Sequence, residues 1–153
     1  MDSQLPPDAL RAIDDSKIIL EHFREAARRR IEFLNSMTQH LQDVVIPAVE
    51  ELAAEFSGTL LELEIDGPGF PLTPQLNITA KLALLPSERP QSIEFRYEPS
   101  HQNNQVKFST ETPSGNWISL NERPLEDLTR EAAIAELAAL LNSTLKRWSA
   151  PLE

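Results

Sequence analysis

The sequence predicts an α+β domain with a long N-terminal helix, an antiparallel β-meander of four or five strands, and a C-terminal amphipathic helix packed on one sheet face. Three observations predict it. Apolar residues recur every three and four positions over the first third of the chain, alternate with polar residues over the middle, and return to the helical spacing near the end. At 153 residues the chain is long enough to build one core.

The first helix is expected to begin near Pro7 or Asp8, after a disordered tail at residues 1–8, and to span residues 9–57. Its apolar stripe has the seven-residue repeat of a coiled coil, carried by Ile13, Leu20, Ala27, Leu34, Leu41 and Ala48. Gly58 is a suitable helix stop, because glycine readily adopts the left-handed conformation of a C-terminal cap.

Pro47 interrupts this helical pattern. Proline has no backbone N–H to donate, and its ring clashes with the carbonyl four residues earlier, here that of Asp43. We therefore expect a kink or a short break between Val45 and Ala48, with the apolar stripe continuing beyond it.

The middle of the chain reads as strands with one polar face. Alternating runs occupy residues 61–65, 76–84, 93–97 and 106–108, and a short fifth run occupies 117–120. Turns are expected at 67–71, 86–90 and 113–116, where glycine, proline and asparagine gather. Because the connections are short, successive strands should pair antiparallel as a meander.

The last helix is predicted over residues 129–148, with Thr129 as its N-cap. Its leucines at positions 137, 141 and 145 should pack on the sheet face that carries Ile78, Leu82, Phe95 and Phe108. Glu136 should lie opposite this apolar stripe, in solvent. Residues 9–153 would then form a single domain from which the N-terminal helix projects.

The length of the first helix predicts self-association. A helix over residues 9–57 is about 70 Å long, whereas a sheet of five strands is only about 24 Å wide. The uncovered half would expose Ile13, Leu20, Phe23, Ala27, Ile31 and Leu34. We expect these residues to form the interface of a homodimer or higher oligomer. The alternative is a helical hairpin that folds back near residues 28–30.

The bulk composition restricts the classes of partner. The net charge of −10 opposes binding to nucleic acid and to anionic membranes, and it would suit an unidentified basic or apolar protein partner. The chain has no cysteine, no signal peptide pattern and no long apolar run. These features favour a cytoplasmic protein.

The sequence contains few candidates for chemistry. Arg28, Arg29 and Arg30 could contact phosphate, but Glu25–Arg29 and Arg28–Glu32 are also four-apart pairs typical of a solvated helix surface. His22 and His40 lie five turns apart, and His101 has no acidic neighbour at ligand spacing, so we expect no metal site. The recognised cofactor motifs are missing from the sequence, and we expect no cofactor.

Two further features leave alternatives open. Glu62, Glu64, Glu94 and Glu98 fall on the polar face of the sheet, where they could act in acid–base chemistry or simply form cross-strand ion pairs. Trp117 is the candidate recognition residue, unless it packs under the final loop. We therefore expect a non-catalytic interaction module, a dimeric adaptor or chaperone-like protein. The alternative is an enzyme that uses the carboxylates of the sheet.

Overall fold

The computed structural model describes residues 4–59, 61–66, 74–82, 91–112 and 114–148. The turns predicted at 67–71 and 86–90 lie outside these residues. The chain forms two units, Met1–Phe33 and Leu34–Glu153, and the boundary between them falls within the first helix.

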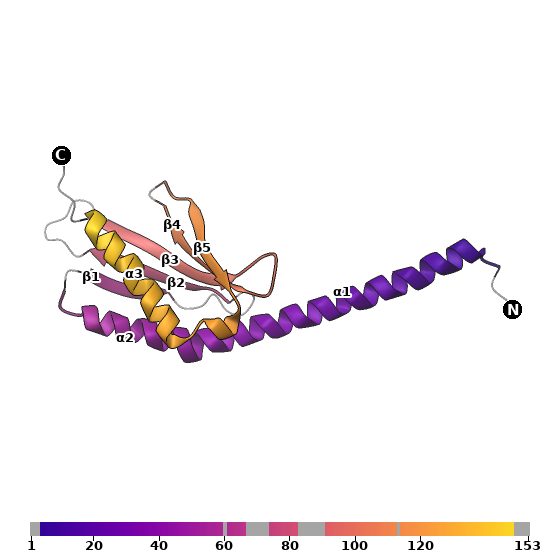
Figure 1. Cartoon of the computed structure of the whole chain (residues 1–153), viewed down its shortest axis with the longest axis horizontal. Helices are drawn as coiled ribbons and strands as arrows, with labels where there is room; N and C mark the ends of the chain where they lie inside the picture. Colours follow the sequence, from indigo (N-terminus) through magenta and orange to yellow (C-terminus); the bar gives the residue numbers. More distant parts are fainter. Residues whose placement is uncertain (1–3, 60, 67–73, 83–90, 113, 149–153) are drawn as a thin grey trace. The chain divides into compact units, whose positions relative to one another are not determined.

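The observed elements follow the predicted order of one long helical segment, five strands and a closing helix (Figure 1). They are α1 (Pro7–His40), a π-helical turn η1 (Leu41–Val45), α2 (Ile46–Phe56), β1 (Leu61–Asp66), β2 (Leu76–Leu82), β3 (Gln91–Pro99), β4 (Val106–Glu111), β5 (Trp117–Arg123), a 3-10 turn η2 (Leu125–Asp127) and α3 (Arg130–Trp148). The α+β prediction is confirmed.

The long helical segment continues past Pro47, as predicted, but its irregular turn lies earlier than predicted. The π-helical turn η1 ends at Val45, and the Ile46 N–H donates to the carbonyl of Leu41, five residues before it. A wider turn makes room for a proline ring that would clash with a carbonyl in a regular helix. The predicted break between Val45 and Ala48 is therefore wrong by about one turn. The alternative of a hairpin near residues 28–30 is also wrong, because α1 is continuous.

Gly58 ends the helical segment as expected. Its φ angle of +85° lies in the left-handed region, which residues with a side chain rarely adopt. The strands that follow form one sheet in the order β1-β2-β3-β4-β5, with every neighbouring pair antiparallel. The register shifts between Phe108 and Ser109, where β5 carries one extra residue. β1 and β5 are the two edges of the sheet.

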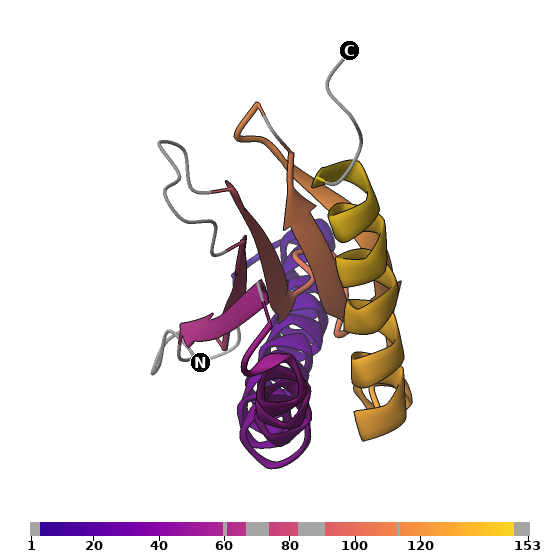
Figure 2. The ribbon, with the colours of Figure 1, turned by 90° about the vertical axis from the view of Figure 1, so that its left-hand side faces the viewer.

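The core of the unit Leu34–Glu153 lies between one face of the sheet and its helices. Figure 2 shows α3 running beside the sheet, and α2 lies against both β1 and α3. Buried on the sheet side are Leu61, Leu76, Ile78, Ala80, Phe95, Tyr97, Val106 and Phe108. Buried on the helix side are Met37, Leu41, Val45, Ala48, Val49, Leu128, Ala133, Leu137 and Leu141. The ring centroids of Tyr97 and Phe108 lie 4.6 Å apart, in a stacked contact at the centre of this core.

The packing of α3 confirms most of its prediction and corrects two residues, Glu136 and Leu145, of which Leu145 is only partly buried. The Thr129 hydroxyl accepts a hydrogen bond from the Ala132 N–H at 3.1 Å, so Thr129 is the N-cap. Leu137 and Leu141 are buried, as predicted. The prediction for Glu136 is wrong, because only 10% of its side chain is exposed.

The error at Glu136 follows from a rotated helix face. The fully buried positions of α3 are Ala133, Leu137, Leu141 and Thr144, whereas Ile134 and Leu145 are only partly buried. This rotation of the buried face by part of a turn brings Glu136 towards the sheet.

Candidate interaction surfaces

The apolar stripe of α1 is the first candidate surface. We use the name α1 stripe for Ile13, Leu20, Phe23, Ala27, Ile31 and Leu34. The first five belong to the unit Met1–Phe33 and are exposed to solvent, with Phe23 68% exposed. Leu34 is the first residue of the other unit and is partly buried.

Several further apolar side chains of α1 are also exposed. They are Leu10, Ile18 and Ile19. Leu10 and Ile19 flank the α1 stripe at helical spacing, whereas Ile18 points away from it. Apolar side chains exposed in a row along one helix face are costly in water and are typical of a surface that binds another protein.

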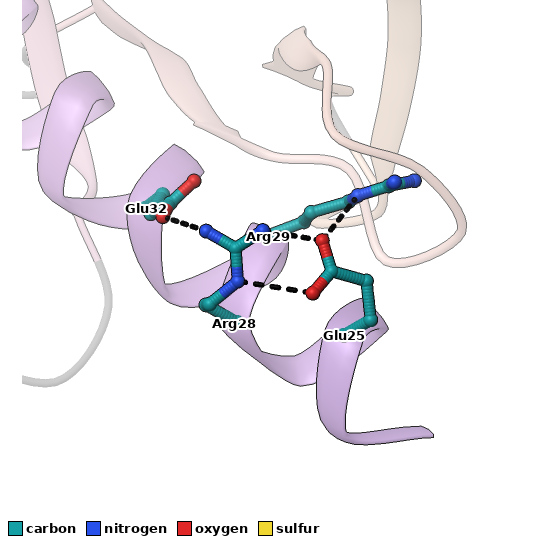
Figure 3. A network of polar contacts seen from close by, with 4 residues as sticks. All are labelled: Glu25, Arg28, Arg29 and Glu32. Atoms are coloured by element: carbon teal, nitrogen blue, oxygen red, sulfur yellow. Dashed lines mark hydrogen bonds and ion pairs between the residues drawn. The ribbon is translucent and has the colours of Figure 1, made fainter. Parts of the chain in front are cut away.

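The polar side chains of α1 form ion pairs within the helix (Figure 3). Arg28 donates to both Glu25 and Glu32, the latter at 2.7 Å, and Arg29 donates to Glu25 at 3.2 Å. The hydrogen bond from Arg28 lowers the pKa of Glu25, and the same contact raises the pKa of Arg28. The two predicted four-apart pairs are confirmed, which leaves these arginines engaged along their own helix.

The carboxylates on the polar face of the sheet do not gather in one place. Glu64 and Glu94 both pair with Thr79 of β2, so two strand spacings, about 10 Å, separate their backbones. Glu62 is offset from Glu94 by a further two positions along the strands, and Glu98 lies four positions along β3 in the opposite direction.

Two of these carboxylates form the cross-strand ion pairs that the sequence suggested. Lys81 Nζ lies 2.8 Å from Glu64. Glu98 lies 3.5 Å from Lys107 Nζ and 3.7 Å from an Arg96 nitrogen, with all three side chains largely buried. These contacts favour a structural role for Glu64 and Glu98 over a catalytic one.

Glu94 is in a different environment. The register of β3 and β4 places it beside Glu111, one position beyond the pair Phe95–Thr110. Burial raises the pKa of Glu94, and the neighbouring Glu111 raises it further. The strand patterns could identify Glu94 as a surface carboxylate, but its contact with Glu111 depends on a register that alternation does not reveal.

Trp117 lies on the same polar face, at the start of β5. Its ring is covered by the guanidinium of Arg96 on β3, whose central carbon is 3.9 Å from the ring centroid. The Arg96 Nε also donates to the Asn77 side chain at 2.9 Å. Trp117 is therefore partly buried by a residue two strands away, a partner that the sequence analysis did not consider.

The other side of β5 borders a shallow groove that the sequence analysis missed. This α3–β5 groove has a volume of about 480 Å³, and its apolar walls include Leu120, Ala132, Ala135, Ala139 and Leu140. Leu120 and the nearby Ile118 are exposed on the edge strand. The alanines that recur along α3 are the signal that could have indicated a helix face with little side-chain cover.

Glu136 forms the polar end of the α3–β5 groove. It accepts hydrogen bonds from the hydroxyl of Tyr97, the side-chain amide of Asn121 and the guanidinium of Arg123. Burial raises the pKa of Tyr97 well above its ordinary value, and Glu136 raises it further. Because each donor is matched to this carboxylate, the cluster resembles a structural crosslink more than a reactive site.

Within the part of the chain that the structure describes, no three His, Asp or Glu residues are placed to hold a metal ion. His40 forms a hydrogen bond with the carbonyl of Leu128, which ties α1 to the start of α3. None of the described helices combines the length and apolar character needed to span a membrane.

Comparison with known proteins adds no functional information. No family model, no curated protein and no solved structure matches this chain.

Proposed function

We propose that this protein is a non-catalytic interaction module, a dimeric adaptor or chaperone-like protein that associates with a second copy through α1. The observation that carries the proposal is the exposure of the α1 stripe. Its large side chains at positions 13, 20, 23 and 31 are between 42% and 68% exposed in the single chain.

The hydrophobic effect supplies the physical reason. Removing the exposed part of one leucine, isoleucine or phenylalanine from water is worth about 1 kcal/mol, roughly half the value for complete burial. Association also costs several kcal/mol of lost translational and rotational freedom. Stable association therefore requires a row of such side chains at coiled-coil spacing, and α1 has such a row.

The contacts on the other surfaces are more typical of a structural role than of a catalytic site. Glu64 and Glu98 are engaged in ion pairs across the polar face of the sheet. Glu94 and Glu111 are adjacent carboxylates, and the pKa of Glu94 is raised, an observation that favours an enzyme. The nearby Thr110 hydroxyl donates to the backbone carbonyl of Glu94 at 3.2 Å, which is a structural contact, and we rank this function second.

A matched pair of single variants tests the proposal. Leu20 lies on the α1 stripe and Ile18 lies off it, yet their exposed fractions are similar, 47% and 56%. Leu20→Asp should shift the molar mass in light scattering towards the monomer, whereas Ile18→Asp should leave it unchanged. Equal masses for the two variants would contradict an interface on this face of α1.

A third variant separates the α1 stripe from the α3–β5 groove. Leu120→Asp places a charge on the exposed apolar wall of that groove. We expect the dimer to persist in this variant. Loss of the dimer in Leu120→Asp, with retention in Leu20→Asp, would move the interface to the groove.

A further inference from the structure

We propose that the two copies of α1 pair antiparallel, with the N-terminal half of the unit Met1–Phe33 of each copy against the C-terminal half of the other. This inference rests on the proposed self-association and adds its orientation. The distribution of charge along α1 and the residues that lie on the α1 stripe support this orientation.

The two halves of this helix carry opposite net charge. Residues 7–21 contain four acidic side chains and two basic ones, a net charge of −2 at neutral pH. They are Asp8, Asp14, Asp15 and Glu21 against Arg11 and Lys17. Residues 22–34 contain four basic side chains and two acidic ones, a net charge of +2. They are Arg24, Arg28, Arg29 and Arg30 against Glu25 and Glu32. The ion pairs of Arg28 and Arg29 lie within the basic half and do not change its total, whereas the pair of Arg24 with Glu21 spans the boundary and leaves a charge of −1 and of +1 on the remainder of the two halves.

Charge of this kind discriminates between the two orientations. Packed helices have axes about 8–10 Å apart, which is close to the Debye length of about 8–10 Å near physiological salt. A parallel pair would set −2 against −2 and +2 against +2. An antiparallel pair sets each acidic half against a basic half, and it also aligns the two helix dipoles favourably.

The position of Arg30 favours the same orientation. Arg30 lies three residues after Ala27, so the seven-residue repeat places it on the seam between the α1 stripe and its partner. In a parallel pair in register, the two copies of Arg30 would face each other. In an antiparallel pair with Leu20 opposite Phe23 of the second copy, Arg30 instead faces Ile13, beside Asp14.

Spin-label distances test the orientation directly. The chain has no cysteine, so His22→Cys and Asn35→Cys each provide one labelling site per copy without changing the net charge at neutral pH. In the antiparallel pair, the two His22→Cys labels lie level with each other along the helices, on the outer faces of the pair, so that the width of the helix pair sets their distance. The two Asn35→Cys labels are separated by roughly 27 residue positions along the helices, or about 40 Å.

The possible outcomes are distinct. A short distance at position 22 and a distance of about 40 Å or more at position 35 are expected. Short distances at both positions would overturn the antiparallel orientation while leaving self-association intact. A chain that light scattering finds to be monomeric would overturn the proposed function and the orientation together.

Discussion

The hydroxyl of Tyr97 on β3 lies 2.9 Å from a carboxylate oxygen of Glu136 on α3 and donates a hydrogen bond to it. Asn121 and Arg123 of β5 also donate to this carboxylate. The contact links the centre of the sheet, its edge strand and the closing helix at one polar point. A largely buried carboxylate such as that of Glu136 stabilises the fold only while its hydrogen-bond donors remain in place.

Glu136→Ala should therefore destabilise the protein by about 2–4 kcal/mol, because three donors lose their acceptor in a mostly buried site. Glu131 on the same helix is the matched control. Its side chain is 80% exposed, and Glu131→Ala should change stability by less than about 0.5 kcal/mol. Urea unfolding of the two variants measures the difference. Coincident midpoints would mean that the Glu136 cluster contributes nothing.

Leu141→Ala should cost about 2–5 kcal/mol, as is usual for a buried leucine whose cavity cannot collapse. Leu141 is 1% exposed between α3 and the sheet. Asn142, its exposed neighbour, provides the control as Asn142→Ala. If thermal unfolding gives the same midpoint for both variants, α3 does not pack on the sheet as described.

Pro47→Ala should change stability by less than about 1 kcal/mol. The substitution restores a backbone donor but loses the restriction that proline places on the unfolded chain. Leu41 and Val45 are already buried in the π-helical turn before it, so the apolar contacts need not change. Urea unfolding measures the effect. A much larger loss would show that Pro47 holds an essential corner.

Glu94→Gln should stabilise the protein at neutral pH. The folded state raises the pKa of Glu94 above its ordinary value of 4.5, chiefly through burial and then through Glu111. The contribution of Glu94 to stability is thus fully present below 4.5 and is lost as pH rises through the folded-state pKa. Melting temperatures of the variant and the unaltered chain should converge on acidification.

A second measurement on the same pair isolates the role of Glu111. Nuclear magnetic resonance titration should give a lower pKa for Glu94 in Glu111→Gln than in the unaltered chain, although burial should still keep it raised. A pKa of Glu94 that does not respond to Glu111→Gln would contradict the assigned coupling.

Most of the fold could be predicted because periodicity reports which face of an element is buried. Alternation placed Ile78, Phe95 and Phe108 on the core face, and Gly58 marked the helix end. The position of the π-helical turn could not be predicted. A proline such as Pro47 can be accommodated either by a kink at the proline or by a wider helical turn before it, and the sequence does not distinguish the two. The prediction for Glu136 was wrong because the buried face of α3 is rotated from the leucine stripe, and because the donors to Glu136 lie on β3 and β5, outside the helix whose spacing carried the prediction.

Of the candidate surfaces, one could be predicted from the sequence and two could not. The α1 stripe could be read from spacing alone, and the exposure of Phe23 and Ile31 agrees with it. The stacking of Arg96 on Trp117 could not be predicted. It depends on the registers of the strand pairs β3–β4 and β4–β5, and on the register shift between Phe108 and Ser109. The α3–β5 groove likewise arises only when the edge strand and the helix are in place.

Self-association through α1 is the central claim, and the molar mass of the unaltered chain tests it most directly. Multi-angle light scattering at tens of micromolar should give at least twice the chain mass of 17.2 kDa. A mass of 17.2 kDa that stays constant as concentration rises would contradict the claim, because the α1 stripe would then remain exposed in solution.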